Sequence, residues 1–164
     1  MIVVRPLDRS DLEAVIADLP ARAPDMHRRR LEQHESGDSV WFVAWLGGRA
    51  IGFVGVGMQN DRDVDEMVEA RGYALVEDLY VEEAYRRRGA ARALMDAIEG
   101  VAREAGMPGM ILDTGVDEYF TPARALYSSL GYVDQGGVYL GGWSDPDRPG
   151  VNLVDPLTAW IKHF

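Results

Sequence analysis

The sequence contains no cysteine, which excludes disulfides, thiolate metal ligands and a cysteine nucleophile. It also lacks any apolar run near the roughly 20 residues that a membrane-spanning helix needs. Positive charge is scarce as well, because 17 basic residues stand against 27 acidic ones and the formal net charge is -10. Nucleic acids and anionic membranes both require a cationic surface. We therefore expect neither of them among the partners.

The length and composition favour one compact unit. With 164 residues, of which 47% are hydrophobic, the chain is long enough to bury one ordinary core. No internal repeat, low-complexity tract or interdomain linker is found, so we expect a single domain over residues 1–164. The alternating segment after Met1 does not resemble a secretory signal, and a cytoplasmic location is the resulting expectation. The oligomeric state stays open, with a homodimer as one alternative.

Hydrophobic periodicity predicts an α/β protein. Four segments have the apolar spacing of helices, and the clearest of them is stopped by Gly106; they are residues 10–19, 25–35, 90–105 and 123–130. Seven segments have strand character; they are residues 2–7, 40–46, 49–58, 73–81, 107–112, 132–143 and 152–164. The pair Gly47–Gly48 predicts a hairpin. The glycines at positions 52, 55 and 57 lie within a strand and indicate close packing or a bulge rather than a dinucleotide site.

An anion site is predicted where the strand ending at Val81 passes into the longest helix. The first N–H groups of a helix lack intrahelical partners and lie at the positive end of its dipole. Gly89 lets a ligand approach the backbone closely, and Ala90 and Ala91 keep the first turn narrow. Three arginines precede this turn and add positive charge; they are Arg86, Arg87 and Arg88. A phosphate is the expected occupant, although these residues alone fit a solvated basic loop equally well.

Two segments resemble the GNAT N-acetyltransferase superfamily. The sequence RRRGAA at residues 86–91 is similar to the family pattern R/Q-x-x-G-x-G/A, in the same strand-to-helix context. The sequence ARALYSSLGY at residues 123–132 resembles a second family pattern, N-x-x-A-x-x-L-Y-x-x-x-G-F/Y. The chain departs from the family at Phe120, where asparagine is frequent, at Glu83, where proline is common, and at Ala91, where a second glycine is commoner. The resemblance implies the GNAT fold: a central mixed, mostly antiparallel sheet of about seven strands, flanked by about four helices.

The same resemblance implies acetyl-CoA as cosubstrate and no metal. In the family, the loop before the helix holds the CoA pyrophosphate through its backbone amides. The preceding strand, here Leu79, Tyr80 and Val81, pairs with the pantetheine arm. The implied function is transfer of the acetyl group to a primary amine of a small molecule or peptide, by direct attack of the amine on the thioester. A catalytically silent acyl-CoA-binding regulatory domain is the alternative, and a plain α/β interaction domain is a third.

Acetyl transfer requires a neutral amine and a proton for the departing thiolate. Tyr127 occupies the tyrosine position of the second pattern, which favours a place beside the cofactor and the role of general acid over simple packing. Glu77 and Asp78 are consecutive on a strand, whose period of two predicts opposite faces. Resemblance to polyamine-type members favours Glu77 as the base, directly or through water, with Asp78 and solvent as alternatives. A backbone N–H near Leu79 or Val81 is expected to stabilise the oxyanion.

An acidic segment precedes the strand that carries Glu77; its members are Asp61, Asp63, Asp65, Glu66 and Glu69. Calcium binding is not expected there, because position six of a calcium-loop pattern that begins at Asp61 is Glu66 rather than glycine, and position twelve is Gly72 rather than glutamate. The three histidines lack a zinc spacing, so no metal site is predicted. Together with the net charge, the acidic segment favours a cationic acceptor as one hypothesis. A negative surface kept for solubility has equal weight.

Overall fold

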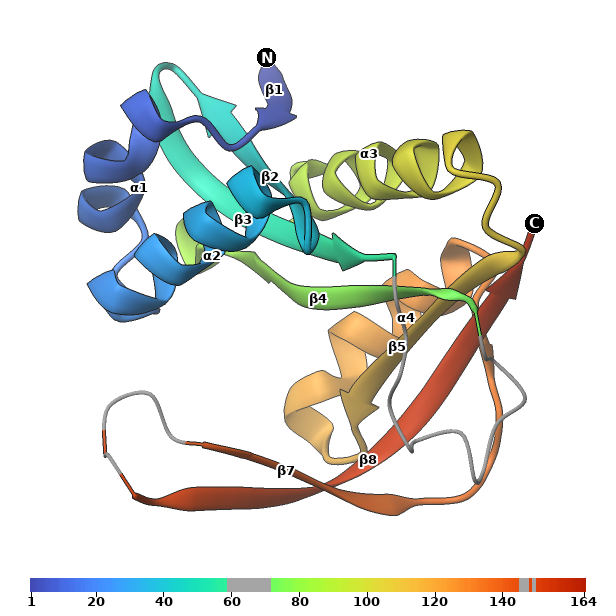
Figure 1. Cartoon of the computed structure of the whole chain (residues 1–164). Helices are drawn as coiled ribbons and strands as arrows, with labels where there is room; N and C mark the ends of the chain where they lie inside the picture. Colours follow the sequence, from blue (N-terminus) through green and yellow to red (C-terminus); the bar gives the residue numbers. More distant parts are fainter. Residues whose placement is uncertain (59–71, 145–147, 149) are drawn as a thin grey trace.

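A mixed sheet with helices on both faces forms the body of the computed structural model (Figure 1), which describes residues 1–58, 72–144, 148 and 150–164. The described strands are β1 (Ile2–Pro6), β2 (Ser39–Leu46), β3 (Arg49–Gly57), β4 (Ala74–Val81), β5 (Gly109–Gly115), β6 (Val133–Asp134), β7 (Tyr139–Ser144) and β8 (Asn152–His163). The helices are α1 (Leu12–Asp18), α2 (Pro24–Ser36), α3 (Ala90–Glu104) and α4 (Thr121–Ser129). Short 3-10 turns lie at Arg9–Asp11, Glu83–Tyr85 and Glu118–Phe120.

The strand order is β1-β2-β3-β4-β5-β8-β6, and β7 pairs with β8. Among the described strand pairs, β4–β5 is parallel and the others are antiparallel. The predicted α/β class and GNAT fold are confirmed, with one difference in the strand count. The segment expected to be one strand over residues 132–143 is two strands, because Gly136 and Gly137 adopt φ angles of 73° and 74° and break the extended backbone.

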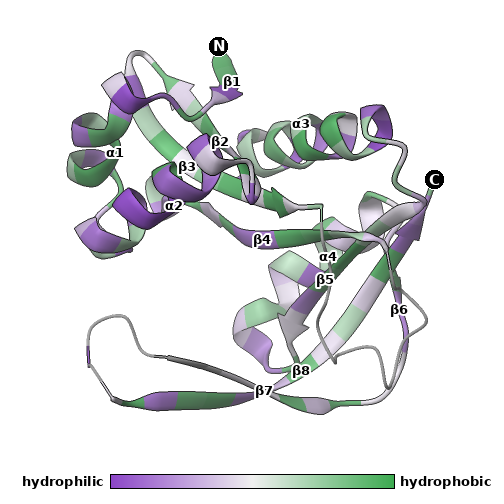
Figure 2. Ribbon diagram, in the orientation of Figure 1, coloured by the Kyte–Doolittle hydropathy of each residue, from purple (hydrophilic) through white to green (hydrophobic). Residues whose placement is uncertain are grey.

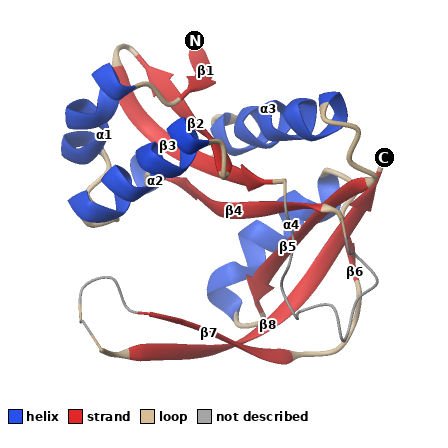
Figure 3. Ribbon diagram, viewed as in Figure 1, coloured by secondary structure: helices blue, strands red, loops and turns tan. Residues whose placement is uncertain are grey.

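Alternating side chains of β2 pack into two separate hydrophobic cores. Phe42 and Ala44 belong to the cluster under α3, whereas Trp41, Val43 and Trp45 belong to the cluster under α1 and α2. This alternation is the period of two that a strand imposes on its side chains. Figure 3 shows α1 and α2 on one side of the β1–β4 part of the sheet and α3 on the other. The buried residues of α3 include Leu94, Met95 and Ile98, which belong to the cluster under this helix, and Figure 2 shows α2 as mostly hydrophilic.

Strands β4 and β5 separate soon after they meet. They pair at Ala74 with Met110 and at Leu75 with Ile111, and beyond these positions they diverge (Figure 1). The remainder of β4 therefore pairs with β3 on one edge and has no β5 partner on the other. This separation places an opening in the middle of the sheet.

A β-bulge lies in the part of β4 that borders this opening. Glu77 pairs with Gly55 and Tyr80 pairs with Phe53, so two β4 residues stand opposite one β3 residue. One of the two is Asp78, which has a φ of 42°. A bulge leaves backbone groups outside the ladder and changes the direction of the side chains that follow.

No helix in the part of the chain that the structure describes is long and apolar enough to cross a membrane.

The packing under α3 generates a stability prediction. Leu94 is 0% exposed, so Leu94→Ala should leave a cavity and lower the free energy of unfolding by about 2–5 kcal/mol. Urea denaturation followed by circular dichroism measures the loss. Leu140→Ala is the matched control, because Leu140 is 74% exposed and its truncation removes little buried area. Equal losses for the two variants would contradict the assigned core.

Candidate active site

A cleft of about 1700 Å³ occupies the opening between β4 and β5. At one end, which we call the loop end, the walls come from the segment before α3 and its first turn; the lining residues there are Arg86, Arg87, Gly89, Ala90, Ala91 and Arg92. At the other, the α2 end, the walls come from the α1–α2 connection and α2; the lining residues there are Ala21, Arg22, Met26, Arg29, Arg30 and Gln33. Strand β4 runs between the two ends, so a single ligand-binding space reaches both faces of the sheet.

The loop end has the backbone geometry of an anion site. Gly89 is the N-cap of α3 with a φ of 89°, and Arg87 also has a positive φ, 64°. The amide of Ala93 makes the first described bond of the helix, 3.0 Å to the carbonyl of Gly89. The amides of Ala90 and Ala91 precede it and have no intrahelical acceptor. A Cβ added at Gly89 would meet nothing within 4 Å, so this backbone is open to a ligand, as a phosphate site requires.

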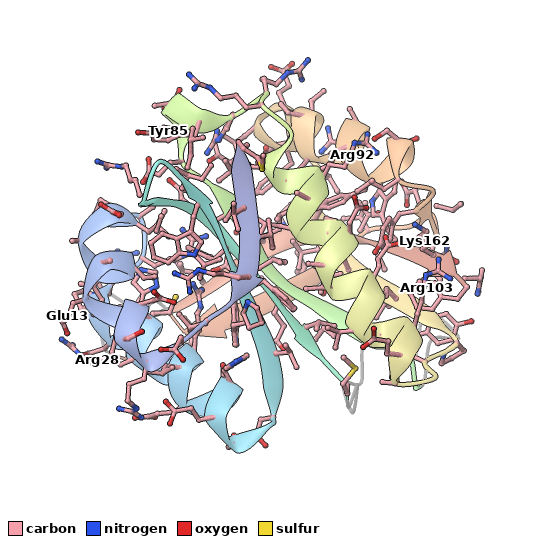
Figure 4. All side chains as sticks on the ribbon, turned by 90° about the horizontal axis from the view of Figure 1, so that it is seen from above. Glu13, Arg28, Tyr85, Arg92, Arg103 and Lys162 are labelled. Atoms are coloured by element: carbon pink, nitrogen blue, oxygen red, sulfur yellow. The ribbon has the colours of Figure 1, made fainter. Side chains whose placement is uncertain are left out.

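The three arginines of the loop have different environments. The Nε of Arg86 donates a hydrogen bond of 2.9 Å to the carbonyl of Val81, which fastens the loop to the end of β4. Arg87 lines the cleft. The guanidinium of Arg88 lies 5.7 Å from the ring centre of Tyr85 instead, a residue labelled in Figure 4. The structure thus brings Arg86 and Arg87 to the cleft and turns Arg88 toward an aromatic ring.

Arg92 is a cleft residue that the sequence analysis missed. Its Nη2 donates a hydrogen bond of 2.9 Å to the Oγ of Ser129, which joins the first turn of α3 to the end of α4. Figure 4 shows Arg92 on the side where these two helices approach each other. The guanidinium of Arg92 adds a further positive charge to the loop end. No motif pointed to it, because its partner is 37 residues away.

The β4 residues that line the cleft include Leu79, Tyr80 and Val81, the three that were predicted to pair with the pantetheine arm. The ring of Tyr80 stacks on Phe53 with centroids 5.5 Å apart, so its side chain packs against the sheet. Its backbone remains at an edge without a β5 partner. Such an edge can accept an extended ligand through main-chain hydrogen bonds.

Tyr127 projects from α4 into the cleft and is only 7% exposed. Burial, together with the negative charge of Asp78, raises the pKa of Tyr127 to about 12. The phenol is therefore protonated throughout the neutral range. The ring of Tyr132 meets it edge to face with centroids 6.1 Å apart, and the Tyr132 hydroxyl donates a hydrogen bond of 3.1 Å to Glu99. The site thus holds a buried, protonated phenol whose ring packs against Tyr132.

Glu77 and Asp78 lie on the same face of β4, so the prediction that they face opposite sides is wrong. Glu77 accepts a hydrogen bond of 2.9 Å from the Oγ of Ser39, which is on the α2 side of β2. Asp78 accepts bonds of 2.9 and 2.7 Å from Arg22 and a third from Arg30, which also belong to the α2 side. The reason is the bulge, because it interrupts the period of two on which the prediction depended.

The two carboxylates differ in what they can do chemically. Burial would raise the pKa of Asp78, but the hydrogen bonds from Arg22 and the charges of Arg30 and Arg22 hold that pKa below its usual range. A carboxylate with a low pKa is a weak base. Asp78 therefore serves as an anchor that ties the α1–α2 connection and α2 to β4. Glu77 accepts a hydrogen bond from the Ser39 hydroxyl, and we take it rather than Asp78 as the candidate for accepting a proton.

Close-packed glycines make room for these side chains. A Cβ added at Gly57 would lie 2.6 Å from the Oε1 of Glu77, and one at Gly55 would lie 2.7 Å from the ring of Trp41. The interpretation of the β3 glycines as close-packing positions is confirmed. The particular need of the Glu77 carboxylate for Gly57 was not predicted, because the two residues are neighbours only across the β3–β4 pair.

The candidates for metal or cation binding have other outcomes. The acidic residues Asp61, Asp63, Asp65, Glu66 and Glu69 lie outside the described residues. Each histidine bonds a neighbour: His27 lies 3.0 Å from the carbonyl of Leu19, His34 accepts from the amide of Trp41, and His163 contacts the hydroxyl of Tyr73. Within the described ranges, no group of three or more potential ligands could hold a metal ion.

Comparisons with known proteins agree with this geometry. The family model Acetyltransferase (GNAT) matches residues 8–132. Human N-acetyltransferase 8 is 33% identical over 89 residues, 54% of this chain, which spans only 38% of that protein. The IAA acetyltransferase of Azospirillum brasilense is 28% identical over 150 residues, which cover 90% of this chain and 86% of that one.

The fold is also similar to that of yncA from Salmonella typhimurium, solved with its cofactor acetyl-CoA. The TM-score is 0.70 at 17% identity, and the similarity covers 99% of this chain and 94% of that one. The residues matched by the family model include the loop before α3, the bulged strand β4 and the helix that carries Tyr127. The chain therefore belongs to the GNAT acetyltransferase family, whose members bind acetyl-CoA and transfer its acetyl group.

Proposed function

We propose that this protein is an N-acetyltransferase that transfers the acetyl group of acetyl-CoA to a primary amine of a small molecule or peptide. The observation that carries the proposal is the cleft itself, which brings the open N-terminus of α3, the free edge of β4, Tyr127 and Glu77 to one space. The human relative is also named for N-acetyl transfer. A catalytically silent acyl-CoA-binding domain remains the alternative.

The described residues fit acetyl-CoA. We assign the pyrophosphate to the backbone amides of residues 86–91, with Arg86 and Arg87 adding charge at the cleft. The free edge formed by residues 79–81 is assigned to the pantetheine arm. Acetyl-CoA supplies a thioester carbonyl for attack and a thiolate as leaving group. No residue of the assignment requires a metal.

Tyr127 is assigned as the general acid. The pKa of a free thiol is about 8.5 and that of a free phenol about 10, and in this site the pKa of Tyr127 is raised to about 12. The phenol therefore keeps its proton and offers a hydrogen bond or the proton where negative charge develops on the leaving sulfur. Backbone N–H groups at the bulge near Leu79 lie outside the regular ladder and are assigned to the carbonyl oxygen.

Glu77 is assigned as the group that accepts the proton of the acceptor amine. Its carboxylate lies at the α2 end and leans across Gly57 toward Ser39, rather than toward β5. Proton transfer through an intervening water follows from this orientation. The amine then approaches from the α2 side, opposite the loop end. The single-domain organisation, the cytoplasmic location and the homodimer alternative stay predictions from the sequence.

Assay of acetyl-CoA consumption against a panel of amines separates the candidate functions. Turnover with an amine supports the proposed enzyme. Saturable acetyl-CoA binding without turnover of any amine favours the silent binding domain, and absence of binding favours an interaction domain.

Gly89→Val should abolish acetyl-CoA binding, because a β-branched side chain would stand in front of the free amides and strain a backbone with a φ of 89°. Isothermal titration calorimetry measures the affinity. Gly106→Val is the control, since Gly106 also has a positive φ, 73°, and open surroundings but follows the other end of α3. Both variants should lose similar stability. Unchanged affinity in Gly89→Val, or equal loss in both, would overturn the phosphate-loop assignment.

Tyr127→Phe should lower kcat by roughly 100-fold with little change in acetyl-CoA affinity, because only the proton donor is removed. Steady-state rates, measured with an amine that the parent enzyme acetylates, provide the test. In the parent enzyme, the pKa of about 12 means that Tyr127 loses its proton only in strong base, so no basic limb in kcat below about pH 11 should come from this residue. A variant as active as the parent would return Tyr127 to a packing role.

Glu77→Gln should remove or displace the acidic limb of kcat/KM, which is measured as initial rates across pH. Asp78→Asn should retain that limb while lowering stability, because it leaves the charges of Arg22 and Arg30 without their carboxylate. Loss of the limb only in Asp78→Asn would move the base to Asp78. If both variants keep the acidic limb, solvent accepts the proton of the amine.

A further inference from the structure

We propose that the acceptor amine also carries a carboxylate, and that Arg29 and Gln33 bind this carboxylate at the α2 end of the cleft. The inference rests on the proposed N-acetyltransferase function and names the chemical class of its acceptor. It concerns described side chains that neither the acetyl-CoA assignment nor the acid–base assignment uses.

Arg29 and Gln33 occupy one face of α2. They are four residues apart and therefore lie one above the other on the helix, and both line the cleft. Arg29 is exposed, and no described residue forms an ion pair or a side-chain hydrogen bond with it. A guanidinium presents paired N–H donors that match a carboxylate, and the Gln33 amide can add a third. The pair is thus a carboxylate-binding arrangement that faces the acceptor space.

The electrostatic balance of the α2 end favours an anion. Arg22, Arg29 and Arg30 line it on the helical side, and Glu77 and Asp78 line it on β4. The other carboxylates that line the cleft come from β5, the segment after it and β8; they are Asp113, Asp117 and Asp155. Asp78 alone is shared by two of the arginines. Among the described residues that α2, the α1–α2 connection and β4 contribute here, three guanidiniums therefore stand against two carboxylates.

Arg30 shows the imbalance most directly. Its side chain is only 8% exposed, its guanidinium lies 4.6 Å from the ring centre of Trp41, and its buried Nη1 has no hydrogen-bond partner among the described residues. Burial lowers the pKa of Arg30, and the charge of Arg22 lowers it further against the opposing effect of Asp78. A ligand carboxylate nearby would offset the cost of this buried charge.

At the α2 end the described arginines outnumber the carboxylates of β4, whereas acidic residues outnumber basic ones in the whole chain. The net charge of -10 motivated the hypothesis of a cationic acceptor, but the acidic segment that supported it lies outside the described residues. An amine that carries a second positive charge would meet Arg29 at the α2 end. An amine that carries a carboxylate would meet an opposite charge there while its amino group reaches Glu77.

Matched acceptors test the inference. We use two sets of acceptors, one with an apolar side chain and one with a polar side chain. Each set contains an amino acid, its carboxamide and the amine that lacks the carboxyl group. We expect kcat/KM to be at least about tenfold higher for the amino acid, as a charge-assisted hydrogen bond allows. Arg29→Gln should remove most of this preference by raising KM for the amino acid, with kcat and the rates for the carboxamide little changed. High salt should reduce the preference in the parent enzyme.

Arg28→Gln is the matched control on the same helix. Arg28 forms a 2.8 Å ion pair with Asp25, lies at the outer edge of the molecule in Figure 4, and is not among the residues that line the cleft. It should leave the preference intact, and Arg29→Lys should restore part of it. Equal or faster turnover of carboxamides and simple amines by the parent, or an unchanged preference in Arg29→Gln, would overturn the inference and leave the N-acetyltransferase assignment standing. Failure of every amine, with acetyl-CoA binding retained, would remove both.

Discussion

The shared carboxylate of Asp78 determines how the α2 side of this molecule meets the sheet. Arg22 approaches it from the α1–α2 connection and Arg30 from α2, and the bulge in β4 turns the carboxylate toward both. Removing one member of a buried charge group leaves the others unpaired, which costs more than the pair itself contributes. The position of α2 and of the α1–α2 connection at the α2 end of the cleft therefore depends on this contact. The exposure of the neighbouring β4 backbone to the cleft depends on it as well.

The parts of the site that sequence reasoning found are those encoded by contiguous residues. The loop before α3 combines a strand end, a glycine and a helix start within residues 81–91, so its anion-binding geometry follows from local chemistry. The segment around Tyr127 is equally local. The split of the expected strand over residues 132–143 also had a local signal, the adjacent Gly136 and Gly137, and a stricter use of the rule for glycine in strands would have predicted it.

The parts that sequence reasoning missed depend on distant contacts or on unusual backbone. Asp78 has a positive φ without being glycine, so nothing in the strand pattern marks the bulge that brings it to the face of Glu77. Ser39 is 38 residues from Glu77, and Arg22 is 56 residues from Asp78. A net charge averages the whole surface and says little about one wall of one cleft, so the hypothesis of a cationic acceptor stays a prediction.

The short paired segment between β4 and β5 divides the sheet into two halves. Two residue pairs join the strands, and beyond them the β1–β4 half and the β5–β8 half face each other across the cleft (Figure 1). A pantetheine arm bound along β4 would take the position of a missing strand and bridge the halves. Acetyl-CoA binding at that position would then be coupled to the cohesion of the sheet, and the two halves would be held together more firmly while the cosubstrate is bound than after the product has left.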